Sequence, residues 1–346
     1  MRYVQVESFG DPEQLKLLDA PTPDPARGQV RVKLTSIGLN RADLMGRAGN
    51  YKASTGEPPY TPGLEGGGVI EAVGEGVDPT RVGQRVTLAP NVPRGVDGPH
   101  GGTYRTHLCL DATFALRAPD AIPDEQLGTL WLPYLTAWGC LVWKANLQPG
   151  QIVGLPAASS SVGLAAAQVV KHHGGVTVGL TSSPEKIDAI RAIEQHSFDH
   201  LVVTHQNDAE GERFDRPWHR DVKQLTDGHG IDVFFDPVAA GTYLSTEIRS
   251  LARGGVIYLY GLLGGSGVVD LQPLIIRRGR IDTFLLYELT GAGDDAWRAG
   301  CDAVFAGFAN GAYRQRIAGR YALDDVPRAH AEMAKNQHIG KLVLVP

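Results

Sequence analysis

Cysteine is scarce in this sequence. Only Cys109, Cys140 and Cys301 occur among 346 residues, and they lie far apart without C-x-x-C spacing. Such a set offers no disulfide framework and suits a reducing compartment. A run of 18 apolar residues is also missing, as is an apolar signal core in the N-terminal stretch MRYVQVESFG. We therefore expect a cytoplasmic protein with neither a transmembrane helix nor a membrane partner.

An excess of positive charge is absent too. The 33 Lys and Arg residues are outnumbered by 38 Asp and Glu residues, which gives a net charge of -5 at pH 7. Because proteins bind the phosphates of nucleic acids through basic surfaces, this balance argues against nucleic acid as the main partner. What remains is an ordinary globular composition, 42% hydrophobic, on a chain long enough for two domains of about 150 residues each.

The hydrophobic patterning divides the chain into three parts. Residues 1–122 carry short β-type runs such as QVRVKLTSIGL between Gly and Pro residues, which predicts a β-rich domain. Residues 123–265 alternate strand and helix patterns, which predicts a doubly wound parallel sheet with helices on both faces. Residues 266–346 return to mixed patterning and end in the strand-like GKLVLVP. We predict an α/β fold in which the parallel-sheet domain is inserted into the β-rich domain, with the last part completing the latter.

A turn rich in small residues, PAASSSVG, joins an apolar strand pattern to an amphipathic helix pattern. This is the layout of a dinucleotide-binding unit, in which the pyrophosphate sits at the N-terminus of the helix. Against the pattern G-x-G-x-x-G/A, only the last glycine is kept, and a serine still lets the backbone approach a phosphate while adding a hydroxyl donor. Alone the turn could be a generic strand–helix junction, but its place at the head of the first β-α unit favours a cofactor site. The predicted contacts are Ala158, Ser159, Ser160, Ser161, Val162 and Gly163.

Acidic residues are absent from Ala158 to Pro184, where an NAD-binding site needs a carboxylate for the ribose 2′-OH. Hydroxyls and a lysine stand there instead, and they suit the 2′-phosphate of NADPH. The same stretch could simply begin a helix, with Ser183 as its N-cap, and both roles are compatible. The predicted 2′-phosphate residues are Thr181, Ser182, Ser183 and Lys186.

Three motifs, GLNRADLMGRAGNY, PGLEGGGVIEAVGEGV and AASSSVGLAAAQVVK, resemble those of the medium-chain dehydrogenase/reductase superfamily. Within it, the chain looks like the zinc-independent quinone oxidoreductase branch that includes zeta-crystallin, over essentially its whole length. The resemblance implies a GroES-like catalytic domain, a Rossmann domain and a cleft between them. Zinc-dependent members bind the catalytic metal with Cys, His and Cys, whereas the matching positions here hold Asn40, Leu64 and Leu132. This donor set cannot form a tetrahedral N/S site, so we expect no metal and take Glu65 as a structural partner for a nearby donor.

The resemblance also implies catalytic residues. Asn40 and Tyr51 match residues that line the cleft of zinc-independent relatives, and Thr136 matches a threonine beside the nicotinamide. Asn40 could donate its amide to the acceptor oxygen or the nicotinamide ribose, and Tyr51 could donate a hydrogen bond or a proton. Asn40 could equally stabilise a turn, Tyr51 could be an ordinary half-exposed aromatic, and Thr136 could bond its own helix backbone.

Further cofactor contacts are expected at the carboxyl ends of two later strands, where ligands gather in open α/β sheets. Two weaker candidates lie in the C-terminal NQHIGKLVL segment, which resembles a segment that closes over the cofactor. These residues are Asp236, Val238, Gly261, Leu262, Asn336 and Lys341.

Together these patterns predict an enzyme, a zinc-independent reductase that transfers hydride from NADPH to a small-molecule quinone or α,β-unsaturated carbonyl. Such acceptors spread the developing charge, so hydrogen-bond donors can stabilise it without a Lewis acid. Alternatives are a 2-enoyl thioester reductase and a non-catalytic NADPH-binding sensor or structural protein. The resemblance also suggests a homodimer formed through the segments GVVDLQPLII and RIDTFLLYEL.

Overall fold

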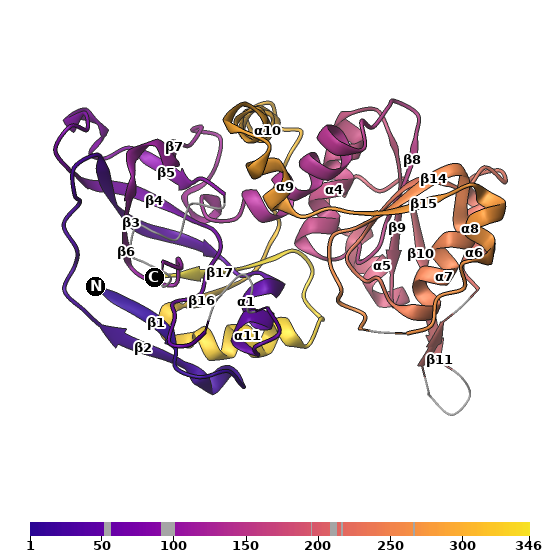
Figure 1. The fold of residues 1–346 in the computed structure, drawn as a ribbon, viewed down its shortest axis with the longest axis horizontal. Coiled ribbons are helices and arrows are strands. Elements are labelled where there is room, and N and C mark those ends of the chain that lie inside the picture. The colour runs from indigo at the N-terminus through magenta and orange to yellow at the C-terminus, as the bar shows by residue number, and fades with distance from the viewer. Residues whose placement is uncertain (52–56, 91–100, 195, 208–212, 216, 266) are drawn as a thin grey trace. The chain divides into compact units, whose positions relative to one another are not determined.

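The chain forms two compact units in a computed structural model that describes residues 1–346 except 52–56, 91–100, 195, 208–212, 216 and 266 (Figure 1). The first unit contains Met1–Leu132 and Cys301–Pro346, and the second contains Pro133–Gly300. The second boundary falls inside helix α10 (Asp294–Ala309).

The first unit is built on a mostly antiparallel sheet that is 7-stranded within the described residues. Its strand order is β16-β17-β3-β4-β5-β7, and β6 pairs with β3 outside this path. The C-terminal strand β17 pairs antiparallel with β3, so the two ends of the chain build one sheet. A separate antiparallel pair, β1 (Arg2–Val6) and β2 (Leu15–Asp19), lies in the same unit. The strands of the large sheet are β3 (Gln29–Gly38), β4 (Gly66–Val73), β5 (Arg85–Leu88), β6 (His107–Asp111), β7 (Ala115–Arg117), β16 (Ile317–Ala322) and β17 (Lys341–Val345).

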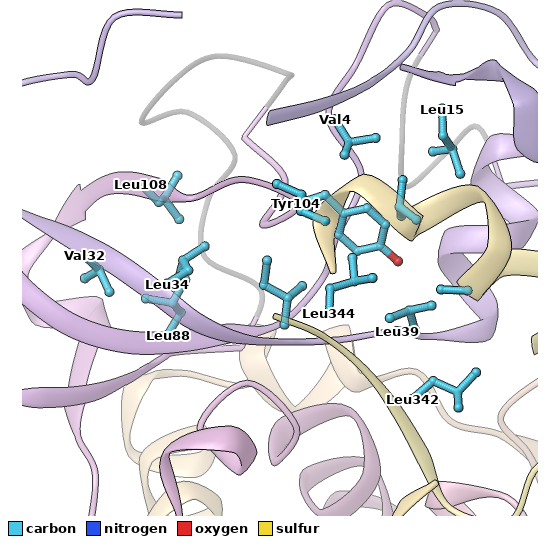
Figure 2. Close-up of a cluster of buried hydrophobic side chains, with 14 of the residues drawn as sticks. Val4, Leu15, Val32, Leu34, Leu39, Leu88, Tyr104, Leu108, Leu342 and Leu344 are labelled. Atoms are coloured by element: carbon cyan, nitrogen blue, oxygen red, sulfur yellow. The ribbon is translucent and has the colours of Figure 1, made fainter. Parts of the chain in front are cut away.

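The core of the first unit is apolar and draws on both parts of its chain. Strand β3 buries alternate residues, including Val32 and Leu34, as a strand with one covered face should. These side chains lie in one cluster with Tyr104 and with Leu342 and Leu344 of β17 (Figure 2). Two helices, α1 (Arg41–Arg47) and α11 (Val326–Ala334), also contribute buried residues to this cluster.

The second unit contains a parallel sheet that is 6-stranded within the described residues, in the order β10-β9-β8-β13-β14-β15. Each neighbouring pair is parallel, and helices connect most of the strands. This is the predicted doubly wound arrangement, so the predicted fold class is confirmed. Its strands are β8 (Ile152–Leu155), β9 (Val176–Thr181), β10 (His200–Val203), β13 (Ile231–Asp236), β14 (Leu251–Leu259) and β15 (Arg280–Thr283). Its helices include α3 (Thr136–Trp138), α4 (Ser161–His172), α5 (Pro184–Arg191), α6 (His219–Leu225), α7 (Gly241–Ser250), α8 (Gln272–Arg277) and α9 (Leu286–Gly291).

The boundaries of the units differ from those that the patterning suggested. Residues 123–132 belong to the first unit, where Ser36 donates to the carbonyl of Glu125 and Leu127 packs against Gly67. Residues 266–300 belong to the second unit, because β15 pairs with β14 along four residue pairs. Contacts with residues distant in the sequence decide both boundaries, and a linear pattern does not reveal them.

All three cysteines are buried. In the part of the chain that the structure describes, every helix is too short or too polar to cross a bilayer.

Candidate functional site

Asn40 stands between the end of β3 and the start of α1, where its backbone N–H donates to Asp43 Oδ2 at 2.8 Å. Its side-chain amide is held from both ends. Nδ2 donates to the carbonyl of Gly38 and to Glu65 Oε1, both at 3.2 Å, while Oδ1 accepts from Lys341 Nζ at 2.6 Å. The structure therefore gives Asn40 the turn-stabilising contacts, and its predicted contact with an acceptor or cofactor remains a prediction.

Glu65 is the centre of this network and is only 1% exposed. Oε1 lies 2.5 Å from the ammonium of Lys341, which is equally buried. Oε2 accepts from the backbone N–H groups of Trp131 at 3.2 Å and Leu132 at 3.1 Å. The expectation that Glu65 is a structural partner for a nearby donor is thus confirmed, and Lys341 is that donor.

A glycine at position 38 is what allows this ion pair to form. A Cβ atom there would lie 2.5 Å from Glu65 Oε1, 2.5 Å from the carbonyl oxygen of Gly128 and 2.7 Å from Lys341 Cε. Any side chain would displace one of the two charges from its partner. Both charges are completely enclosed, so the pair depends on close geometry and on its additional hydrogen bonds.

A second buried polar cluster supports the start of α1. Asp43 accepts from the backbone of Asn40 and of Gly63, and burial raises its pKa to about 6, an effect that the bond from Asn40 opposes. The Tyr104 hydroxyl interacts with Asp43 and lies 3.1 Å from His330 Nε2. Burial, together with Arg47, lowers the pKa of His330 to about 3, so this imidazole is neutral at physiological pH. The cluster fixes the backbone from which Asn40 projects.

The positions that match zinc ligands in metal-dependent relatives hold no metal-binding group other than an amide. Leu64 precedes Glu65, and Leu132 uses its backbone N–H to hold the Glu65 carboxylate. Across the described residues, no cluster of three or more His, Cys, Asp or Glu side chains could hold a metal ion. Metal independence remains a prediction, and the residues Asn40, Leu64 and Leu132 at these positions support it.

The other two predicted catalytic residues lie in different units. Tyr51 is half-buried in the first unit and directly precedes the undescribed residues 52–56. Thr136 is buried and begins helix α3 in the second unit. Their roles at a common site remain predictions.

The predicted phosphate turn is a strand–turn–helix junction in the second unit. Strand β8 ends at Leu155, and Ser160 is the N-cap of α4, where its Oγ accepts from the N–H of Gly163 at 3.0 Å. A Cβ on Gly163 would lie 2.6 Å from the carbonyl oxygen of Ala157, so only glycine permits the helix to pack this closely on the turn. The Ala158 N–H donates to Leu180 of β9 at 3.0 Å, which ties the turn to the neighbouring strand. Ala158 and Ser159 are buried, whereas Ser160, Ser161 and Val162 are half-exposed.

The predicted 2′-phosphate residues lie at the end of the neighbouring strand. Strand β9 ends at the buried Thr181, and Ser182 and Ser183 follow it. Ser183 is the N-cap of α5, and its Oγ accepts from the N–H of Lys186 at 3.4 Å. Its predicted capping role is therefore confirmed, while the contacts of Ser182 and Lys186 with a phosphate remain predictions.

The loops after β13 and β14 are joined to each other. Both carboxylate oxygens of Asp236 accept backbone N–H groups, from Val238 at 2.6 Å and from Ala239 at 2.8 Å. The carbonyls of Pro237 and Val238 in turn accept from Leu263 at 2.9 Å and Gly264 at 2.8 Å. These bonds join the loop that carries Asp236 and Val238 to the loop that carries Gly261 and Leu262, and contact of the four residues with a cofactor remains a prediction.

The C-terminal candidates are engaged within the first unit. Arg41 donates to the side-chain oxygen of Asn336 and, at 3.1 Å, to the carbonyl of Met333. Asn336 begins the NQHIGKLVL segment just after α11 and has a left-handed backbone, φ 57°. Lys341 is committed to Glu65 and Asn40, so its predicted contact with a cofactor stays a prediction.

Two features of the site were not expected from the sequence. One is the ion pair between Glu65 and Lys341, and the other is Glu247, a fully buried glutamate in α7. For Glu247 a signal existed, because it shares the apolar face of α7 with Tyr243, Leu244 and Ile248 at helical spacing.

A β-rich unit completed by the C-terminus, together with a parallel-sheet unit that carries a small-residue turn, defines the architecture of the medium-chain dehydrogenases. Comparison with known families agrees with it. Residues 26–120 match the alcohol dehydrogenase GroES-like domain, and residues 161–304 match the zinc-binding dehydrogenase family.

The chain belongs to the medium-chain dehydrogenase/reductase superfamily and is a quinone oxidoreductase-like enzyme within it, as the sequence motifs predicted. It is 31% identical over 347 residues to the quinone oxidoreductase of Pseudomonas aeruginosa, with 99% of each chain covered. The quinone oxidoreductase of Pseudomonas syringae pv. Tomato has a similar structure, with a TM-score of 0.82, 27% identity and coverage of 100% and 99% of the two chains. A mycobacterial protein solved in complex with NADPH matches over 100% of both chains, with a TM-score of 0.82 and 26% identity.

Proposed function

We propose that this protein is an NADPH-dependent, zinc-independent reductase that transfers hydride to a quinone or an α,β-unsaturated carbonyl. The observation that carries the proposal is the pair of helix starts after β8 and β9. Ser160 begins one helix and Ser183 the other, and the carboxylate that would select NADH is absent between them. The similar mycobacterial protein was solved with NADPH, which supports the same cofactor here.

The nucleotide would be held mainly by backbone groups. The N-terminus of α4 offers free N–H groups and the positive end of the helix dipole to the pyrophosphate. Ser160 accepts from Gly163, which leaves its hydroxyl hydrogen to donate to a phosphate oxygen. Ser182 and Lys186 would receive the 2′-phosphate beside the N-terminus of α5. When bound, NADPH supplies the hydride, and the protein orients the acceptor and excludes water.

The class of acceptor follows from the residues at the positions that match zinc ligands in metal-dependent relatives. A simple ketone concentrates the developing charge on one alkoxide oxygen and is a poor substrate without a Lewis acid, and the positions that match zinc ligands hold an amide and two leucines. A quinone or enone spreads the charge into a quinolate or enolate, which neutral donors stabilise. The P. aeruginosa relative, named a quinone oxidoreductase, favours a quinone.

Tyr51 is the donor we favour for the acceptor oxygen. Both amide hydrogens of Asn40 have internal acceptors in Gly38 and Glu65, so donation from Asn40 would require exchange of one of these bonds. Thr136 would lie beside the nicotinamide, as the family resemblance implies. A Tyr51→Phe variant that keeps its NADPH affinity but loses turnover would support the donor role, whereas unchanged turnover would contradict it.

The function is tested by following NADPH and NADH oxidation with 1,4-benzoquinone, 9,10-phenanthrenequinone, simple enones and crotonyl thioesters, each with and without a chelator. We expect quinone or enone reduction with NADPH that a chelator does not affect. Preference for the thioester would favour the enoyl thioester reductase, and NADPH binding without turnover on any acceptor would favour a sensor. Loss of activity with chelator and its return with zinc would contradict metal independence.

Cofactor preference is tested separately with Lys186→Glu. Charge reversal beside the 2′-phosphate should weaken NADPH binding much more than NADH binding. Equal losses for the two cofactors would contradict the assignment of Lys186. Lys171→Glu is a suitable control, because Lys171 lies in the last turn of α4 and pairs with Asp199.

We also propose that the protein is a homodimer. Strand β15 is an edge strand of the parallel sheet within the described residues. Several apolar side chains before and within α8 are strongly exposed, and a second copy would cover them. They are Val268, Leu271, Ile275 and Ile276. Light scattering should give twice the chain mass for the wild type and the monomer mass for Ile276→Asp, whereas a wild-type monomer would refute the dimer.

A further inference from the structure

Glu247 lies in the middle of helix α7 in the second unit and has no exposed surface. Glutamate is seldom fully buried unless a cation or hydrogen bonds compensate its charge. In the described part of the chain, neither of its buried carboxyl oxygens has a hydrogen-bond partner of ordinary geometry. The ionisable group that acts on it is another acid, the equally buried Asp236 at the end of β13.

Two buried carboxyl groups that interact in this way cannot both carry a charge at low cost, so one of them retains a proton. Burial, and secondarily the charge of Asp236, holds the pKa of Glu247 well above its usual range. Burial also raises the pKa of Asp236 to about 6, and the N–H groups of Val238 and Ala239 and the neighbouring Glu247 oppose this rise. Near neutral pH the proton therefore resides on Glu247 and the charge on Asp236.

The charged Asp236 organises the edge of the sheet. Its two oxygens hold the N–H groups of Val238 and Ala239, and Ala239 has a left-handed backbone, φ 50°, that a non-glycine residue adopts only when it is held. Through the carbonyls of Pro237 and Val238, the same turn holds the segment around Leu263. A change of charge on Asp236 would loosen both loops.

We propose that Glu247 is a positioning residue for the cofactor site: its carboxyl proton, directed at Asp236, keeps Asp236 ionised and thereby holds loops 237–239 and 261–264 in a cofactor-binding arrangement. The link to the cofactor rests on the proposed function, whereas the link to the loops does not. Binding of the nicotinamide cofactor should therefore weaken when acid protonates Asp236.

Tyr260, which interacts with Asp236, and its neighbour Cys140 are neutral in the same pH range. Tyr260 follows β14, stacks on Phe235 with ring centroids 3.9 Å apart and has a pKa well above its usual range through burial and Asp236. Burial likewise raises the pKa of Cys140, which faces Tyr260. Arg249, also on α7, is paired with Asp270. On α6, burial and the neighbouring charges of Arg249, Arg220 and Lys223 lower the pKa of His219, and Asp221 opposes this. Arg277 of α8 donates to the backbone carbonyl of Arg249.

The test compares the full-length wild type with Glu247→Leu, Glu247→Gln and, as a matched control, Thr246→Val. Leucine fills the site but donates no hydrogen bond, whereas glutamine keeps an N–H donor for Asp236. Thr246 is buried on the same helix, and its hydroxyl donates to the carbonyl of Thr242 at 2.9 Å. The dissociation constant of NADP⁺ is measured by calorimetry from pH 5 to 8.5.

We expect the wild type, Thr246→Val and Glu247→Gln to lose affinity together as the pH falls through about 6. In Glu247→Leu this loss of affinity should begin at a pH about one unit higher. Because one proton is linked to binding, the dissociation constant should change by at most about tenfold per pH unit. The 2′-phosphate of the cofactor titrates near pH 6 as well, but it contributes equally to all four proteins. The proposal is overturned if Glu247→Leu loses affinity at the same pH as the wild type. It is also overturned if Glu247→Gln loses affinity at a higher pH than the wild type.

A second measurement needs no cofactor. Amide hydrogen exchange, corrected for its intrinsic pH dependence, reports directly on the Val238 and Ala239 N–H groups. Their protection should be lost at a higher pH in Glu247→Leu than in the wild type. If the wild type binds no nicotinamide cofactor, the proposed function fails; unchanged protection of these amides in Glu247→Leu would overturn the role of Glu247 by itself.

Discussion

Each unit of this enzyme encloses a glutamate completely, and the two glutamates are compensated in opposite ways. Glu65 in the first unit meets an ammonium at 2.5 Å and two backbone N–H groups. Glu247 in the second unit meets another acid, Asp236, so only a retained proton can relieve the repulsion. The first arrangement depends on a cation brought from a distant strand. The second depends on the position of one proton, and it should therefore respond to pH.

The largest effect is expected from removing the cation of the first arrangement. Lys341→Met leaves Glu65 buried without its partner, which should lower the free energy of unfolding by about 3–5 kcal/mol. Urea denaturation of the purified protein measures this loss. The double variant Glu65→Gln/Lys341→Met should recover part of it, because no uncompensated charge is then buried.

Lys335→Met is the control for that experiment. Lys335 pairs with Glu332 at 3.0 Å on the surface of the protein. Exposed pairs of this kind contribute about 1 kcal/mol or less. If Lys341→Met were no more destabilising than Lys335→Met, the buried ion pair would not be a major determinant of stability in the first unit.

A smaller loss is expected when the ion pair is only forced apart. Gly38→Ala places a Cβ 2.5 Å from Glu65 Oε1, and overpacking of this kind costs about 1–3 kcal/mol. The same denaturation experiment measures it. Gly291→Ala is the matched control, because within the described residues its added Cβ meets nothing within 4 Å beyond its chain neighbours and the backbone of its own helix. Equal stability of the two variants would contradict the steric role of Gly38.

The effect that separates the two arrangements is the pH dependence of Glu247→Gln, which is absent near pH 5 and accumulates only as the pH rises. A carboxyl whose pKa is raised by folding stabilises the native state fully only below its unfolded pKa, and this contribution is lost as the pH rises. The glutamine side chain of this variant has no proton to lose, so the variant should gain stability relative to the wild type from about pH 5 upward, by at most about 1.4 kcal/mol per pH unit.

Thermal unfolding at several pH values follows this difference. Thr246→Val should keep the pH dependence of the wild type, because it leaves the carboxyl pair intact. A difference between Glu247→Gln and the wild type that stays constant from pH 5 to 8 would show that Glu247 does not hold a proton in the folded protein.

Much of the fold could be predicted because it depends on local patterns. The alternation of β3 and the strand–turn–helix at Ser160 are written in consecutive residues, and so is the N-cap at Ser183. The unit boundaries could not be predicted in the same way. Residues 266–300 join the parallel sheet through the pairing of β15 with β14, which no local pattern encodes.

The candidate site shows the same limit. That Glu65 would need a nearby donor followed from its charge and from the missing zinc ligands. The identity of that donor did not, because Lys341 comes from the last strand and its contact Asn40 lies 301 positions away. Glu247 occupies an apolar face that helical spacing could have revealed, but its neighbour Asp236 comes from a different element.

By itself, the sequence determined the family, the two kinds of domain, the small-residue turn and the absence of an acid after the second strand of the parallel sheet. These features depend on residue type and short spacing, which a linear chain carries. Only the tertiary structure decided which buried charge meets a cation and which meets another acid. Burial makes that choice important, because a charge removed from water is tolerated only with the partner that the fold places beside it.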